Sequence, residues 1–325
     1  MSKLSDLRYC TELVVLRNFD DIPFDTADNP QHASLVYQRF CGTLSEKFIE
    51  FDLNSLDDEA AYYLISKTSL SLEQLLKNPD IRVFFNSELF VFLNRSEHIE
   101  IRLLKKDMDI QAEYSNILQI LEGLDKQYPF ARSGNQYINS RRELRGTGAF
   151  INHFVHLPIL QYFNKIGAEQ YLKQNIDIRK SSAPDANPIC SMIKISTDNC
   201  YFDDIEQQSN HVYKYMNEIL HKELREQEEL KSNSLFSLKD KVNKAFGVAK
   251  YALLLDELEF LSLHTFFRTA SEFDLIGISS KKIDSIFEKI FSQTYYIDDF
   301  ESACASRSQL VRKVLVPLLK DTMEE

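Results

Sequence analysis

The chain has 325 residues, 44% apolar and 27% charged, as in an ordinary globular protein with one or two cores. Its 49 acidic against 38 basic residues give a net charge of −11, which argues against a nucleic-acid-binding surface. Only eight glycines and eight prolines argue against the many tight turns of a β-sandwich or propeller. No apolar run is long enough to span a membrane, and the first residues lack the apolar core of a signal peptide. The five cysteines form no Cys-x-x-Cys motif, so we expect free thiols in the cytoplasm.

The first third of the chain predicts helices around a short N-terminal strand. A strand or lead-in segment is expected within residues 9–25, a helix over 31–50, and a short helix over 69–77 that Pro79 closes. Residues 80–94 predict a buried helix, because their apolar residues fall in one stripe: Ile81, Phe84, Phe85, Leu89 and Phe92. Residues 97–104 alternate in polarity and could form a strand.

The middle of the chain centres on a Gly-Thr-Gly sequence at 146–148. A clear amphipathic helix is expected over residues 110–124. Thr147 is then expected to cap an apolar helix that begins near Ala149, with a second helical segment over 158–166. On such a helix His153 and His156 stand at i and i+3, roughly on one face. The small and polar residues of 181–199 predict a long loop or a domain boundary.

The last third predicts helices over residues 205–230, 236–270, 281–291 and 303–320, with a kink at Pro317. The expected fold class is therefore all-α, a multi-helix bundle with at most one or two short strands near the N-terminus. We expect a mainly helical region over 1–105 and a helical domain over 106–325, although one single domain fits the pattern as well.

Four arginines surround the Gly-Thr-Gly loop, with Glu143 as the acidic residue among them: Arg132, Arg141, Arg142 and Arg145. Arginines beside a helix N-terminus can bind an anion such as a substrate carboxylate. The plain alternative is a turn, a helix cap and solvated arginines. Both interpretations stay open.

Two further patterns could hold a metal. His264 stands in the apolar run LEFLSLHTFF, where a helical protein could place an axial haem ligand, although most such histidines are core residues. Glu218 and His221 have the Glu-x-x-His spacing of di-iron sites, but no second copy follows, and a charged helix surface is the alternative.

The segments ARSGNQY (131–137), RGTGA (145–149) and FINHFVHLPILQYFNKIG (150–167) together resemble the indoleamine and tryptophan dioxygenases, including the haem protein of pyrrolnitrin biosynthesis. The resemblance implies an all-helical haem enzyme that oxygenates an aromatic substrate. It implies His264 as proximal ligand and Gly146, Thr147 and Gly148 as the loop against haem or substrate. His153 or His156 would serve as catalytic acid–base groups, and an arginine would bind a carboxylate.

The leading hypothesis is therefore a cytoplasmic haem-dependent oxidoreductase for an aromatic or amino-acid-like small molecule, with no nucleic-acid or membrane partner. A homodimer is an open alternative to a single chain. One alternative is a non-catalytic adapter, immunity or effector protein that uses the arginine loop as a partner surface. Another is a non-haem metal-dependent oxidase built around Glu218 and His221. An absorption spectrum separates these hypotheses, because haem gives a strong Soret band.

Overall fold

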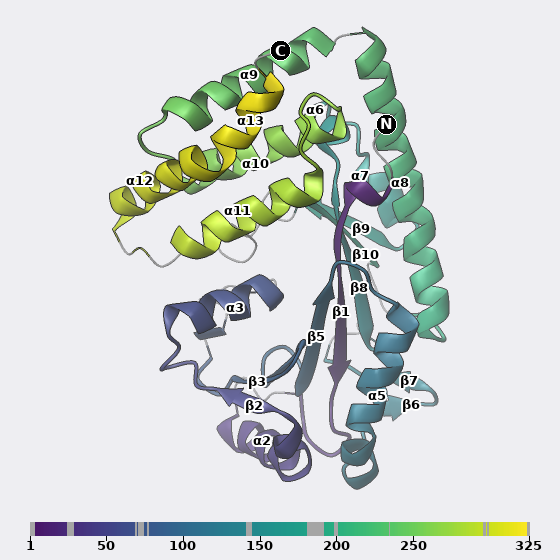
Figure 1. The fold of residues 1–325 in the computed structure, drawn as a ribbon. Coiled ribbons are helices and arrows are strands. Elements are labelled where there is room, and N and C mark those ends of the chain that lie inside the picture. Colours follow the sequence, from purple (N-terminus) through teal and green to yellow (C-terminus); the bar gives the residue numbers. More distant parts are fainter. Residues whose placement is uncertain are drawn as a thin grey trace.

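The protein is built around an eight-stranded antiparallel sheet with the strand order β2-β3-β4-β5-β1-β8-β10-β9 (Figure 1). The computed structural model describes residues 4–24, 29–68, 70, 75–76, 78–140, 145–180, 192–197, 201–233, 235–294, 297 and 299–323. The strands of the sheet are β1 (Arg8–Arg17), β2 (Ile49–Phe51), β3 (Arg82–Asn86), β4 (Leu89–Leu93), β5 (Ile99–Lys105), β8 (Ala149–His156), β9 (Ile176–Lys180) and β10 (Met192–Thr197). A separate two-stranded ribbon pairs β6 (Arg132–Ser133) with β7 (Gln136–Tyr137).

The all-α prediction is wrong, because two segments expected as helices are strands. Residues 80–94 fold as the β3–β4 hairpin, with Ser87 at φ 49° in the turn. Residues 149–156 form β8, which lies between β1 and β10 in the middle of the sheet. Both segments are rich in aromatic and β-branched residues, which suit a pleated surface. Strands buried on both faces have near-continuous apolar sequences that periodicity alone does not separate from a buried helix.

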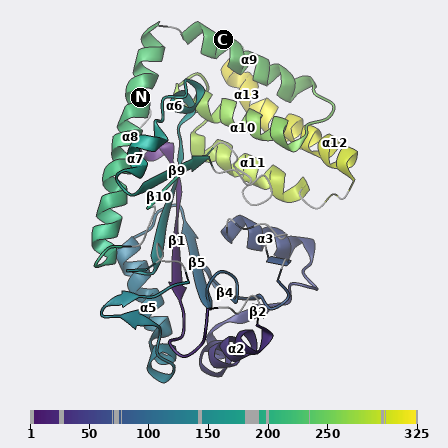
Figure 2. The same ribbon diagram turned by 180° about the vertical axis from the view of Figure 1, so that it is seen from behind.

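Helices cover both sides of the sheet (Figures 1 and 2). One side carries α2, α5 and α8, and the other carries α3 and the C-terminal helices α9–α13. The helical elements are α1 (Leu4–Leu7), α2 (Pro30–Leu44), η1 (Ser45–Lys47), α3 (Asp58–Thr68), α5 (Ile110–Gln127), α6 (Pro158–Tyr162), α7 (Ala168–Leu172), α8 (Ile205–Asn233), α9 (Leu235–Tyr251), α10 (Glu257–Glu272), α11 (Ser280–Thr294), α12 (Phe300–Leu310), the π-helical turn η3 (Val311–Leu315) and α13 (Val316–Met323).

Strand alternation divides the side chains of the central strands between two faces. The odd-numbered residues of β1 and β8, such as Leu13 and Ile151, pack against α2 and α5, and Val155 packs against α8. We call this side the helix-covered face. The even-numbered residues, such as Glu12 and Asn152, lie on the opposite side, which we call the cavity face. The C-terminal helices have an apolar core of their own, which includes Phe260 and Phe291.

Several other expected elements are present. The expected strand segment 9–25 contains all of β1 but its first residue, and the alternating run 97–104 contains most of β5. Helices α5 and α8 match the helices expected over 110–124 and 205–230. Of the expected loop 181–199, residues 192–197 are strand β10, and the remainder lies outside the described residues. The division at residue 105 stays a prediction. Among the described helices, none has the length and apolarity that crossing a membrane requires.

Candidate functional site

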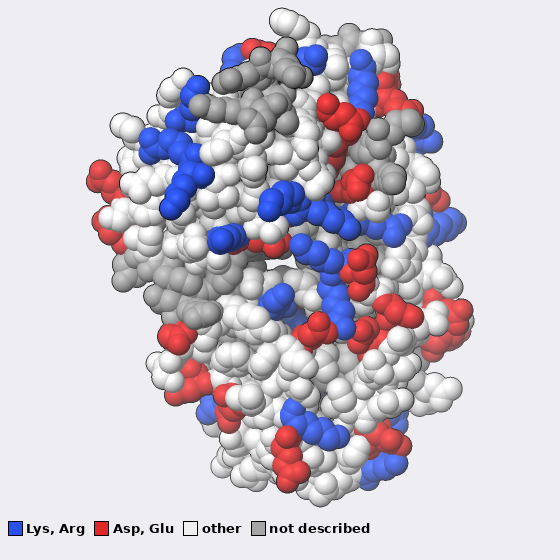
Figure 3. All heavy atoms as spheres, viewed as in Figure 1, with Lys and Arg blue, Asp and Glu red and all other residues white. Residues whose placement is uncertain are grey.

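A cavity of about 440 Å³ opens on the cavity face, above the middle of strands β5, β1, β8, β10 and β9. Its walls combine apolar residues with charged and amide or hydroxyl side chains. The polar residues that line it are Arg95, Ser96, Glu100, Arg102, Asn152, Asp177, Arg179, Lys194, Ser196 and Thr197. Four of these residues are cationic, in contrast with the net charge of −11: Arg95, Arg102, Arg179 and Lys194. Figure 3 shows one side of the molecule, on which Lys and Arg side chains also gather across the middle with acidic side chains beside them.

Arg102 is the centre of the charge network on the cavity floor. Its Nη1 lies 2.6 Å from Glu12 Oε1, and its Nε lies 2.6 Å from Glu100 Oε1. Arg95 Nη1 reaches the other oxygen of Glu100 at 2.7 Å. Burial alone would raise the pKa of Glu100, but Arg102 and Arg95 outweigh it and lower this pKa to about 2. The Glu100 carboxylate is therefore ionised at every physiological pH.

The edge of the cavity carries a second, more exposed pair on β9. Arg179 Nε lies 2.7 Å from Asp177 Oδ2, and the side chain of Arg179 is 68% exposed. Lys194, on the neighbouring β10, has its pKa lowered by burial, although Glu12 and Asp177 oppose the shift. An anion that entered the cavity would hold Lys194 in its charged form and would remove this penalty.

Such a site can recognise two kinds of chemical group. Guanidinium and ammonium groups bind phosphate oxygens, and arginine does so with a two-pronged geometry. Buried carboxylates in turn bind guanidinium groups. The cavity therefore suits a reaction or a complex that contains both phosphate and guanidinium.

The Gly-Thr-Gly loop does not cap a helix, because Ala149 begins strand β8. The loop instead wraps around the buried side chain of Arg17, which donates to the carbonyl oxygens of Leu16 at 2.6 Å and Gly148 at 3.2 Å. Gly148 has φ +60°, and a Cβ at this position would lie 2.7 Å from Arg17 Nη1. Thr147 Oγ1 donates to Gln208 Oε1 on α8 at 2.6 Å. Gly146 exchanges backbone hydrogen bonds with Tyr137 at 2.8 and 3.2 Å. These contacts give Gly146, Thr147 and Gly148 a role in joining β8 to its neighbours.

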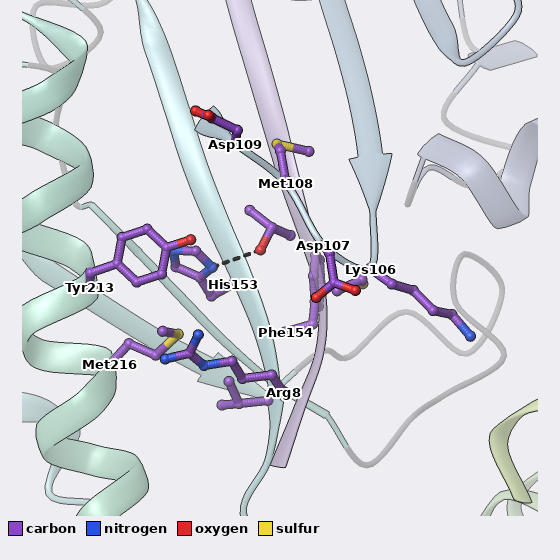
Figure 4. A pocket seen from close by; sticks show the side chains of 12 residues that line it. Arg8, Lys106, Asp107, Met108, Asp109, His153, Phe154, Tyr213 and Met216 are labelled. Atoms are coloured by element: carbon purple, nitrogen blue, oxygen red, sulfur yellow. Dashed lines mark hydrogen bonds between the residues drawn. The ribbon is translucent and has the colours of Figure 1, made fainter. Parts of the chain in front are cut away.

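His153 and His156 lie on opposite faces of the sheet, because successive side chains of a strand point to alternate faces and residues i and i+3 therefore point in opposite directions. His153 belongs to the helix-covered face and lines a cavity of about 360 Å³ next to Tyr213 (Figure 4). Its Nδ1 is 2.9 Å from the hydroxyl of Thr11, and burial together with Arg8 lowers its pKa to about 3. His156 lies on the cavity face, where its Nδ1 is 2.8 Å from Glu272 of α10. The shared helix face expected for the two histidines does not exist.

His264 lies in helix α10 and is engaged with protein groups. Its Nε2 is 2.9 Å from Asp284 Oδ1 on α11, and Arg268 pairs with the same carboxylate. Burial lowers the pKa of His264, and Asp284 opposes this shift. His264 thus occupies a buried ionic cluster that joins two C-terminal helices, away from the Gly-Thr-Gly loop.

The structure describes two of the four arginines of the predicted anion loop. Arg132 pairs with Asp125 at the end of α5, and Arg145 is exposed. Arg141 and Arg142 lie outside the described residues. Glu218 and His221 are exposed on α8, and no cluster of three or more metal-ligating side chains occurs among the described residues.

Sequence reasoning missed the residues of the cavity. Glu100-x-Arg102 and Asp177-x-Arg179 place opposite charges two residues apart within apolar runs. At a strand period of two, this spacing puts both charges on one face of a buried sheet. The signal was present, but it is readable only once these segments are known to be strands.

Comparison with known proteins gives a consistent result. Residues 32–227 match the family model described as ATP:guanido phosphotransferase, C-terminal catalytic domain. The chain is 23% identical over 291 residues to the protein-arginine kinase of Clostridium botulinum, covering 86% of each chain. It is 22% identical over 323 residues to the protein-arginine kinase of Clostridium perfringens, covering 94% of this chain and 95% of that one.

The same fold occurs in a solved structure, the duplicated taurocyamine kinase of Schistosoma mansoni with bound transition-state-analogue components. The TM-score is 0.58 at 16% identity, and the match covers 71% of this chain. This chain spans 35% of the length of that duplicated protein.

These matches overturn the haem interpretation. The resemblance to indoleamine and tryptophan dioxygenases rested on short glycine-rich and apolar segments, and the segment after the glycines is a strand. The prediction of a haem cofactor, and with it haem-dependent oxygenation, is wrong. The adapter and metal-oxidase alternatives find no support in the same matches. The family description names ATP and a guanido group, in keeping with the expected small-molecule substrate. Because the matched region covers more than half of the 325 residues, this chain belongs to the ATP:guanido phosphotransferase family.

Proposed function

We propose that this chain binds ATP in the cavity face and transfers its terminal phosphoryl group to a guanidino group, in particular that of an arginine side chain in a protein. The observation that carries the proposal is the cavity itself, in which four cationic side chains surround buried carboxylates within the matched family region: Arg95, Arg102, Arg179 and Lys194. The protein-arginine kinases of the two clostridia support the choice of acceptor.

The reaction requires few chemical groups from the protein. A guanidino nitrogen attacks the γ-phosphorus, the bond to the β–γ bridging oxygen breaks, and ADP leaves with the electron pair while the nitrogen loses a proton. Arg179 and Lys194 are placed to contact phosphate oxygens at the open side of the cavity. Such groups act chiefly by positioning the phosphates and stabilising their charge.

Mg²⁺ accompanies ATP in this class of reaction and neutralises phosphate charge. Carboxylate oxygen is the ligand it prefers, and phosphates and water supply the others. The residues fit such an ion at one place. The oxygens of Glu100 accept from Arg102 and Arg95, whereas the partner of Asp177 is the exposed Arg179. Asp177 is therefore the lining carboxylate that would hold Mg²⁺, directly or through water.

The decisive test measures ATP binding and phosphoryl transfer separately. Calorimetric titration with ATP and Mg²⁺ should show binding, and ³¹P NMR with an arginine-containing peptide should show a phosphorus–nitrogen product. The double variant Arg179→Ala, Lys194→Ala should weaken ATP binding by about tenfold or more, because two charged phosphate contacts are lost. Lys239→Ala, an exposed lysine on α9 outside the cavity, is the matched control. Absence of ATP binding in the unaltered chain would refute the proposal.

A second candidate function is binding of the same groups without transfer. It is favoured by the low pKa of Glu100, about 2, since so weak a base accepts a proton from a guanidinium poorly. In that case ATP binds but no phosphorus–nitrogen product forms. A carboxylate-bearing acceptor such as free arginine, and a homodimeric state, stay predictions that substrate comparison and light scattering can test.

A further inference from the structure

The floor of the cavity contains a complete guanidinium-binding site. Two carboxylates, Glu12 and Glu100, meet Arg102 at 2.6 Å each, and the carbonyl oxygen of Thr68 accepts from its Nη1 at 2.9 Å. Asn152 donates to the second oxygen of Glu12 at 2.7 Å and fixes this carboxylate in place. Three acceptors around one planar fork match the donors of a guanidinium group.

The register of the sheet builds this site without any loop. Arg102 stands opposite Val14 on the neighbouring β1, so Glu12 is its diagonal neighbour, and Glu100 lies two residues away on β5 itself. All three side chains therefore project from the same face. The carboxylates are 2% and 1% exposed, and the Arg102 side chain is 12% exposed.

The pair at the cavity edge provides an internal comparison. Arg179 binds Asp177 through one contact and is 68% exposed, so solvent and incoming ligands compete for it readily. Removal of Arg102 would instead break its contacts with two buried carboxylates, of which Glu100 would keep Arg95, and the loss of such buried contacts is strongly unfavourable. An external guanidinium therefore does not displace Arg102.

We infer that Arg102 is a built-in occupant of the guanidinium site formed by Glu12 and Glu100, and that it closes this site to external guanidino compounds. The inference rests on the proposed function, because it specifies where a guanidino acceptor binds in the same cavity. A small guanidino compound cannot bind at the buried floor, because the guanidinium of Arg102 already occupies the carboxylates there. An acceptor must then bind above this floor, toward the open side of the cavity, which an arginine carried on a polypeptide can reach.

Methylguanidinium is the probe for this inference. Methylammonium is the control, because it carries the same charge but lacks the planar set of guanidinium donors. The unaltered chain should show no saturable binding of methylguanidinium at the floor. Arg102→Ala should create such binding, at least about tenfold tighter for methylguanidinium than for methylammonium. The double variant Arg102→Ala, Glu12→Gln should lose it again.

Arg39→Ala is the matched control, since Arg39 forms a two-pronged pair with the exposed carboxylate of Asp21, at 2.6 and 2.7 Å. This variant should gain no binding, because a single exposed carboxylate is a poor guanidinium site. If Arg102→Ala does not fold alone, its refolding yield becomes the readout. Recovery with methylguanidinium and not with methylammonium supports the inference, and equal yields overturn it.

Other outcomes also decide the matter. Equal methylguanidinium affinity in the unaltered chain and in Arg102→Ala, or no discrimination from methylammonium, would overturn the inference. Failure of the unaltered chain to bind ATP refutes the proposed function but leaves the methylguanidinium result intact, so the two failures are distinguishable.

Discussion

The two faces of the central sheet differ in the partners that their buried charged side chains have. On the helix-covered face, charged or polar side chains occur singly among apolar neighbours and are satisfied by neutral groups, as Arg17 is by carbonyl oxygens and His153 by Thr11. On the cavity face, charges occur in connected pairs, with Arg102 between two carboxylates. The first arrangement joins elements, and the second concentrates charge at the floor and edge of a cavity. The same strands thus separate a structural face from a chemical one.

The largest effect is expected on the helix-covered face, from Arg17→Met. Arg17 is fully buried, its guanidinium lies 3.4 Å from the centre of the Tyr137 ring, and it donates to Tyr114 at 3.0 Å. Loss of these charged hydrogen bonds should lower the free energy of unfolding by about 4 kcal/mol, measured by urea denaturation. Arg132→Met, which removes a more exposed guanidinium from the same ring, is the control and should cost less than about 1 kcal/mol. Equal costs would contradict the distinction between a structural and a peripheral arginine.

On the cavity face, Glu100→Gln should cost about 3 kcal/mol, because Arg95 and Arg102 lose their shared carboxylate. The same change leaves excess positive charge in the cavity, so affinity for ATP should rise while stability falls. Denaturation and calorimetry on one preparation check both signs. A parallel fall in stability and ATP affinity would show that the pair shapes the cavity and does not compete with the nucleotide.

The pH dependence of stability tests His153. Burial, with Arg8, lowers its pKa from 6.5 to about 3, so the unfolded chain binds the proton more readily between these values. Stability contributed by neutral His153 is fully present above pH 6.5 and is lost as the pH falls. Between pH 7 and pH 5 the loss should reach about 2 kcal/mol. His153→Gln should remove that part of the slope in denaturation curves, and an unchanged slope would exclude His153 as its source.

The smallest effect is expected from Arg179→Ala. Because this side chain is 68% exposed, its pair with Asp177 should add less than about 0.5 kcal/mol to stability. ATP affinity should nevertheless fall, since Arg179 is placed to contact phosphate. Unchanged ATP affinity together with a large loss of stability would reverse the assignment of this edge pair.

The sequence predicted the elements whose pattern belongs to one secondary structure only. The amphipathic helices α5 and α8 were readable because each exposes one side and buries the other, and the strand β5 because its sequence alternates in polarity. Segments 80–94 and 149–156 were not, since their residues are buried on both faces and a continuous apolar run carries no period. The error then reached the site, because His153 and His156 share a helix face but not a strand face. The spacing of Glu100 and Arg102 indicates a shared face only if residues 99–105 are known to form a strand.

The π-helical turn at Val311–Leu315 has a consequence for insertions and deletions. The amide of Val316 donates to the carbonyl of Val311, five residues back, just before Pro317, which has no amide hydrogen to donate. Deleting one residue here would convert the π turn into an ordinary α-helical turn and would leave the direction of α13 almost unchanged, because the π turn already accommodates one extra residue. Leu319, fully buried in the C-terminal core, would keep its place. A single-codon deletion in this short stretch should therefore be better tolerated than one in the middle of an ordinary helix such as α10, where it would turn the following residues by about 100°.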